Sequence, residues 1–268
     1  GIDIIRIPLI ARGHSSIGMV MNYLSFVVSG FFWKCFTKVK ADLEGSRGEL
    51  LRAQENKLQL ESFRATLDEN LIATKQEGWF AFIDWCPGLE CMTALQGVYI
   101  YTLERFVRLL KVIGDKEYEK YCFLISKVRC ASKKHLYDES REVFVNSLDN
   151  AQFSVHSQVW MILGGVITGE EAKKLLVSCL DNKGFMQPVT PYMRHYVIEA
   201  MLKLDMKNEA MRYLKKFWGG MVELGADTFW EAYIPEDLEF SPYKDRMINS
   251  LCHAWSCTPS YFIRKYGL

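Results

Sequence analysis

The sequence CMTALQGVYIYTLERFVRLLKVIGDKEYEKYCFLISKVRCASKK, residues 91–134, indicates the fold class. In its first half, apolar side chains recur every three or four residues, which predicts an amphipathic helix over 91–113. Gly114 then supplies the left-handed residue on which helices commonly end, and Asp115 suits the N-cap of a second helix to about residue 134. Two long helices joined by so short a turn must run antiparallel, so this stretch predicts a helical hairpin.

Paired helices continue toward the C-terminus. Thr190 and Pro191 supply an N-cap and a first helical residue, and Thr168 with Glu171 forms a T-x-x-E capping box. The helices expected in this half of the chain cover 154–166, 168–180, 190–204, 205–217 and 244–257, with a short one from 258. Residues 76–90 contain Gly and Pro and are expected to form a loop, and 137–145 has short β-like or irregular character. The pattern predicts an all-α protein of antiparallel hairpins, with longer loops that carry polar side chains.

Composition excludes several classes of partner. The chain has 268 residues, 49% hydrophobic and 24% charged, and a net charge of +1, so it has no basic field for a nucleic acid. The most apolar run, residues 19–33, is too short and too polar to span a membrane, and we expect a buried helix over 18–43. No small-residue cleavage site follows that run, which disfavours a signal peptide. We therefore expect neither a nucleic-acid nor a membrane partner.

Cysteine spacing gives no sign of a metal centre. The eight cysteines form no C-x-x-C pair and no Cys/His cluster at zinc spacing, and no calcium loop of the D-x-D-x-D-G type occurs. The pairs Cys86/Cys91 and Cys252/Cys257 are each five residues apart and are expected to be small buried apolar side chains. We expect no metal and no cofactor, and the redox compartment stays open.

The segment GADTFWE, residues 225–231, is the strongest candidate for chemistry. Apolar walls raise the pKa of a neighbouring acid, and a flat ring can stack on the C–H face of a sugar, so Glu231 beside Phe229 and Trp230 suits a glycosidase. Glycoside hydrolysis needs two carboxylates, one to protonate the leaving oxygen and one to activate water or attack. Taken alone, a W-E pair is more often a buried aromatic next to a capping acid.

Three segments together strengthen the sugar hypothesis: GWFAFIDWCPGLE, WGGMVELGADTFWEAY and SPYKDRMINSLCHAWSCTPSYFIRKYG. In order, spacing and residue type they resemble the C-terminal part of the catalytic domain of glycoside hydrolase family 78, the bacterial α-L-rhamnosidases. The resemblance covers residues 76–268, whereas 1–75 match poorly. It implies an α/α toroid of antiparallel helical hairpins, of the six-hairpin glycosidase type. We expect residues 1–268 to form a single domain of this kind, incomplete on its N-terminal side.

The resemblance also implies roles for particular residues. Glu231 falls on the family's general base for an inverting hydrolysis. His253 falls on a histidine that contacts the sugar, although the preceding Asn of the family is Cys252 here. Asp84 and Trp85 match a D-W segment that lines the pocket, where Asp84 is expected to bind sugar hydroxyls and Trp85, with Trp230, to stack on the sugar. His156 opens a polar run at the start of an inner helix and is expected among the substrate-binding residues, although a lone His there is otherwise most often a satisfied core residue.

The family's general acid lies in an R-D-E-R-x-G-W type of loop, and no such motif occurs in this sequence. The acid would therefore come from outside the chain, or from Asp84 or Glu90 in an atypical role. The leading interpretation is an inverting hydrolase of terminal α-L-rhamnosides, with a carbohydrate as partner and, by resemblance, a bacterial periplasmic location. The alternatives are a sugar-binding helical fragment without turnover and a six-hairpin enzyme for another sugar, such as a uronidase.

Overall fold

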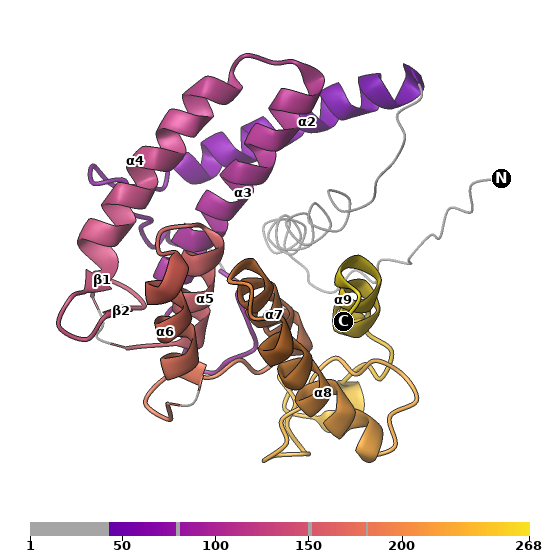
Figure 1. Cartoon of the computed structure of the whole chain (residues 1–268). Helices are drawn as coiled ribbons and strands as arrows, with labels where there is room; N and C mark the ends of the chain where they lie inside the picture. The colour runs from indigo at the N-terminus through magenta and orange to yellow at the C-terminus, as the bar shows by residue number, and fades with distance from the viewer. Residues whose placement is uncertain (1–42, 79–80, 150–151, 181) are drawn as a thin grey trace.

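Helices joined by turns and long loops build the computed structural model, which describes residues 43–78, 81–149, 152–180 and 182–268 (Figure 1). The α-helices are α2 (Leu43–Arg64), α3 (Met92–Ile113), α4 (Tyr118–Leu136), α5 (Val155–Leu163), α6 (Gly169–Leu180), α7 (Pro191–Lys203), α8 (Lys207–Glu223) and α9 (Thr258–Tyr266). Two 3-10 turns, η1 (Arg246–Ile248) and η2 (Ala254–Ser256), lie between α8 and α9. The strands β1 (Tyr137–Asp138) and β2 (Val143–Phe144) pair antiparallel, as the β-like stretch predicted.

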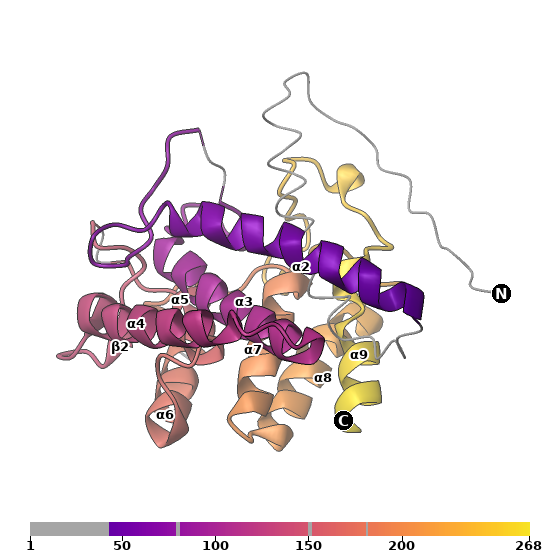
Figure 2. The same cartoon turned by 90° about the horizontal axis from the view of Figure 1, so that it is seen from above.

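The hairpins α3–α4, α5–α6 and α7–α8 follow one another along an arc (Figure 1). Helix α5 packs against both α3 and α7, so these three form the inner row, and α4, α6 and α8 each lie against their own inner partner. Figure 2 shows the same row from above, with α2 lying across α3. This is the alternation of inner and outer helices of an α/α toroid, and the predicted fold class is confirmed.

The hairpin predicted over residues 91–134 is present. Helix α3 ends at Gly114, whose φ of 75° is left-handed and whose N–H bonds to the carbonyl of Lys111. The Asp115 Oδ1 atom accepts the N–H of Glu117 at 2.8 Å, so Asp115 helps to start α4 although the N-cap position itself is Glu117. Thr190 caps α7 as expected, with Pro191 as the first helical residue.

The inner helices α3 and α5 approach each other very closely at Gly97. A Cβ atom added there would lie 2.6 Å from the backbone carbonyl atoms of Trp160 on α5. A side chain at position 97 would therefore force the two helices apart. The Trp160 ring is fully buried between Tyr101 and Tyr196, and so fills the space where α3, α5 and α7 meet.

Four expectations need correction, and a fifth concerns residues that the structure does not describe. Residues 244–257 are not a helix but two 3-10 turns joined by irregular chain, and α8 runs six residues beyond the predicted end, to Glu223. The side chain of Glu171, expected in a capping box, instead contacts Lys133 and Tyr137 of the neighbouring hairpin. Of the two cysteine pairs expected to be buried, Cys252 is exposed and Cys86, Cys91 and Cys257 are half-buried. The buried helix expected over 18–43 falls almost wholly outside the residues that the structure describes.

Candidate active site

Four loops meet at one end of the helical arc. Because α3, α5 and α7 run in the same direction, their N-termini lie at the same end, and each outer helix ends there too. The loops at this end include residues 81–91, 145–149 with 152–154, 182–190 and 224–257. Active sites favour loops held by a rigid scaffold, so this end is where a site is expected, and it contains every site residue predicted from the sequence.

Glu231 is buried, with only 4% of its surface exposed, and each of its carboxylate oxygens accepts one hydrogen bond. The Tyr243 hydroxyl donates to Oε1 at 2.6 Å, and the backbone N–H of Ser250 donates to Oε2 at 2.8 Å. A carboxylate oxygen can accept about two hydrogen bonds, so each oxygen keeps capacity for a further proton donor. The Glu231 side chain is therefore held in one orientation while it stays able to accept a proton.

Two segments far apart in the sequence bring Glu231 and His253 together. The N–H of Glu231 donates to the carbonyl of Ser250 at 2.8 Å, and the N–H of His253 donates to the carbonyl of Phe229 at 2.7 Å. Thr228 adds a side-chain bond to the carbonyl of Leu251. We call these paired segments, 228–231 and 250–253, the Glu231 ladder. As predicted, the imidazole faces the acid: His253 Nε2 lies 3.9 Å from Glu231 Oε1.

The His253 ring has a defined orientation and protonation. Its Nδ1 atom accepts the N–H of Trp255 at 3.4 Å, which places the proton of the neutral ring on Nε2, toward Glu231. Burial lowers the pKa of His253 below its usual 6.5, and the charge of Glu231 opposes this only in part. At neutral pH the ring is therefore an uncharged N–H donor that faces the carboxylate side of the site.

Aromatic rings connect the Glu231 ladder to the loop before α3. The ring of Trp255 lies 4.2 Å from that of His253 and stacks parallel to Phe82 at 6.2 Å. Trp85 contacts Phe82 edge-on at 4.9 Å and Tyr243 at 6.0 Å. Trp85, predicted as a pocket residue, thus belongs to an aromatic group that also holds the Glu231 donor Tyr243. Sugar sites use such flat apolar surfaces.

Three of these aromatic residues were not predicted from the sequence: Phe82, Tyr243 and Trp255. Trp255 was within reach of prediction, because it lies two residues after His253; in the structure it donates its indole N–H to the Glu231 carbonyl at 2.8 Å. Tyr243 lies in the third quoted segment, but the sequence did not single it out, since its position beside Glu231 depends on the path of a loop. Trp230, which was predicted, points to another neighbour: its ring contacts Tyr233 edge-on at 6.3 Å, and Tyr233 packs on Phe217 of α8.

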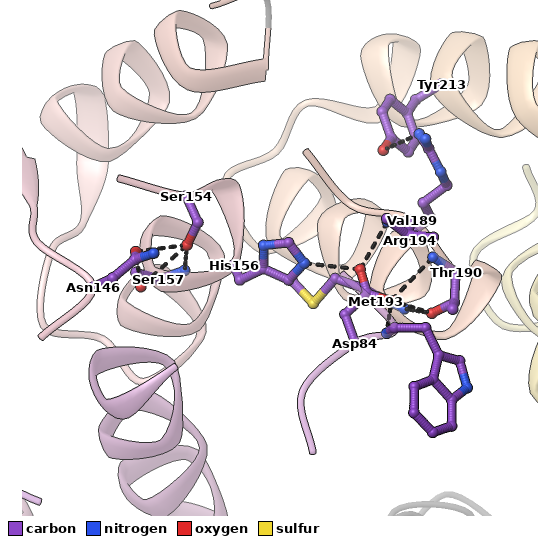
Figure 3. A network of polar contacts seen from close by, with 11 residues as sticks. Asp84, Asn146, Ser154, His156, Ser157, Val189, Thr190, Met193, Arg194 and Tyr213 are labelled. Atoms are coloured by element: carbon purple, nitrogen blue, oxygen red, sulfur yellow. Dashed lines mark hydrogen bonds and ion pairs between the residues drawn. The ribbon is translucent and has the colours of Figure 1, made fainter. Parts of the chain in front are cut away.

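Asp84 is at the centre of a buried polar network (Figure 3). Its side chain has no exposed surface, and its oxygens accept five hydrogen bonds from the protein. The donors are the N–H groups of Trp85, Val189 and Thr190, the Thr190 hydroxyl at 2.6 Å, and His156 Nε2 at 2.8 Å. Both the carboxylate and Thr190 thus stabilise the N-terminus of α7. We expected Asp84 to bind sugar hydroxyls directly; that role is untested, and the geometry favours an indirect one.

His156 is also fully buried, in the first turn of α5. Because an ionised carboxylate only accepts hydrogen bonds, His156 Nε2 carries the proton shared with Asp84. The next residues of the polar run are likewise engaged inside: Gln158 bonds to both backbone groups of Phe144, and Ser157 to Asn146. His156 therefore fixes the Asp84 loop against α5, and its predicted contact with a substrate is untested.

Thiol chemistry does not fit this site. Burial, and then the charge of Asp84, raise the pKa of the Cys86 thiol to about 12, and burial raises that of Cys91 to about 11. Within the described residues, no three His, Cys, Asp or Glu side chains gather in a metal-binding arrangement. In the same part of the chain, no helix is both long and apolar enough to cross a membrane.

Comparison with known proteins gives matches among solved structures. No family model matches the sequence, and no curated protein matches it. A rhamnosidase from Klebsiella oxytoca, solved with rhamnose bound, is 32% identical over 94% of this chain, with a TM-score of 0.79. A rhamnosidase of family GH78 from Bacillus sp. GL1 is 22% identical over 83% of this chain, with a TM-score of 0.70, and this likeness concerns the fold.

These matches show that the chain has the helical fold of solved rhamnosidases over most of its length. The resemblance to glycoside hydrolase family 78 predicted from the sequence is thereby confirmed. The chain spans 46% of the length of the Klebsiella protein and 24% of that of the Bacillus protein.

Proposed function

We propose that this chain carries the general base of a glycoside hydrolase that cleaves terminal α-L-rhamnosides with inversion at the anomeric carbon. The observation that carries the proposal is the buried Glu231 carboxylate, fixed by Tyr243 and Ser250 and faced by His253 at 3.9 Å. The similarity of this chain to a rhamnosidase solved with rhamnose bound supports rhamnose as the sugar.

In this proposal Glu231 removes a proton from the water that attacks the anomeric carbon, on the face opposite the leaving group. The neutral His253 ring donates its Nε2–H to a sugar hydroxyl beside the carboxylate. Trp85 and Trp255 offer flat apolar faces to the sugar ring. Asp84 and His156 act indirectly: their hydrogen bonds hold Trp85 and the N-terminus of α7 in place. The general acid is a separate carboxyl group that protonates the leaving oxygen.

The test is hydrolysis of an aryl α-L-rhamnoside by the wild-type protein and by Glu231→Gln. Replacement of a general base lowers kcat by about 10²–10⁴-fold, whereas KM should change little because the amide keeps the shape of the side chain. The matched control is Glu236→Gln, an exposed carboxyl group five residues further along, which should leave kcat unchanged. Proton NMR of the first-formed sugar should show the inverted anomer. Turnover near the wild-type rate in Glu231→Gln would refute the assignment.

A second candidate function is binding of the sugar without turnover. The observation that favours it concerns Asp84, one of the two residues considered for the general acid. Its oxygens already accept five hydrogen bonds from the protein, so Asp84 is poorly placed to protonate a leaving group. Calorimetry with L-rhamnose separates the two functions. Binding without hydrolysis supports this second candidate, and the absence of both binding and hydrolysis contradicts both.

A further inference from the structure

We infer that Tyr243 is the positioning residue of Glu231: its hydroxyl fixes the carboxylate in the orientation needed to take a proton from water. This inference rests on the proposed function of Glu231 and assigns a role to a residue that was not among the predicted site residues. Tyr243 acts through Glu231 and is not itself required to touch the substrate.

The first support is the hydrogen-bond geometry. The Tyr243 hydroxyl reaches Glu231 Oε1 at 2.6 Å, a short distance typical of a hydroxyl donating to a charged oxygen. The Ser250 N–H occupies the other oxygen, so the carboxylate plane is set by two donors that come from different parts of the loop. Without Tyr243, Oε1 loses the donor that stops the carboxylate from turning about its last bond. Proton transfer requires a base held in place, so this freedom lowers the rate.

The second support is that the loop around Tyr243 is built to hold it. The Ser241 hydroxyl accepts the N–H of Tyr243, and Ser241 also bonds to the Asn249 side chain and the Asp245 carbonyl. Lys244 adopts a left-handed backbone with φ of 64°, which is costly for a residue with a side chain and is kept only where the surrounding bonds impose it. The ring itself rests edge-on against Trp85.

The third support is the exposure of the pair. Tyr243 is 40% exposed, while Glu231 is almost fully covered. The hydroxyl therefore reaches inward from the surface to the acid. His253 also lies next to this carboxylate, but the 3.9 Å between its Nε2 atom and Glu231 Oε1 is too long for a direct hydrogen bond.

The experiment compares Tyr243→Phe with a matched control, Tyr137→Phe. The control also removes a Tyr hydroxyl that donates to a Glu carboxylate, here Glu171 at 3.0 Å, but between β1 and α6. Phe keeps the ring contact with Trp85 and removes only the hydroxyl. With an aryl α-L-rhamnoside we expect kcat of Tyr243→Phe to fall about tenfold with KM within twofold, and the control to match the wild type. Thermal unfolding should be alike in the two variants.

A second readout does not need turnover. In protein labelled with ¹³C at the Glu carboxyl carbons, the Glu231 signal is identified by its loss in Glu231→Gln. At neutral pH its chemical shift should change in Tyr243→Phe, since the carboxylate loses a hydrogen-bond donor, and should stay in place in Tyr137→Phe. An unchanged chemical shift, or a raised KM with unchanged kcat, would overturn the positioning role. If Glu231→Gln remains active, the proposed function fails instead, so the two failures are distinguishable.

Discussion

Asp84 and Glu231 are both buried acids in loops at the same end of the helices, yet their surroundings differ. Asp84 accepts five hydrogen bonds from backbone and side-chain groups of three loops and helices, and its side chain has no exposed surface. Glu231 accepts two, and it faces the partly exposed side chains of Tyr243 and His253. A carboxylate whose acceptor capacity is used by the protein stabilises the fold, whereas one with capacity left can take part in a reaction. Burial alone does not separate the two roles.

The largest expected effect on stability follows from Asp84→Asn. The amide cannot accept five bonds, and it leaves His156 and three backbone N–H groups without their charged partner, so the free energy of unfolding should fall by about 3–5 kcal/mol. Glu231→Gln should lower it by about 1 kcal/mol or less, because only two bonds are affected. Urea unfolding of both variants measures the difference. An equal loss of unfolding free energy in the two variants would contradict the proposed difference between Asp84 and Glu231.

A smaller effect is expected for Thr190→Val, which keeps the shape of the side chain. It removes the 2.6 Å bond to Asp84 and the cap of α7 at the Met193 N–H, so the free energy of unfolding should fall by about 1–2 kcal/mol. Affinity for L-rhamnose, measured by calorimetry, should stay within twofold. A larger loss of affinity than of stability would mean that the Asp84 network contacts the sugar after all.

The smallest effect concerns pH and the Glu231 side of the comparison. Since burial lowers the folded-state pKa of His253 below 6.5, the unfolded chain binds this proton first as the pH falls. The contribution of His253 to stability is thus present above pH 6.5 and is lost as the pH falls below it. Because the side chain is 31% exposed, the loss should be under about 1 kcal/mol. Between pH 7.5 and 5.5 the wild type should lose more stability than His253→Gln; an equal loss in both contradicts this.

Much of the fold could be predicted because its signals are local. The hairpin over 91–134 depends on the period of apolar residues and on Gly114, and α7 on Thr190 and Pro191, all within a few residues of the structure they specify. The prediction of a helix over 244–257 is wrong because the backbone bonds of that segment go elsewhere. Ser250 and His253 bond to residues of the Glu231 ladder, which competes with helical pairing.

The site could be predicted in part. The approach of His253 to Glu231 followed from a resemblance that preserves order and spacing. The engagement of Asp84 could not be predicted, because its donors His156 and Thr190 lie 72 and 106 residues away in sequence. A D-W pair gives the type of side chain, but the partners that use its oxygens are set by how the inner helices meet. Tyr243 was missed because its approach to Glu231 depends on the path of the loop that joins them.

The Glu231 ladder also has a consequence for how this molecule can change over time. The chain leaves at Glu231 and returns at Ser250, two residues joined by a backbone hydrogen bond of 2.8 Å, so residues 232–249 form an excursion with both ends anchored. Side chains on its outer surface, such as Met247 at 90% exposure, can be exchanged without altering those anchors. Substitutions on the exposed surface of residues 232–249, other than at Tyr243, can therefore accumulate in evolution or be designed while Glu231 keeps its position.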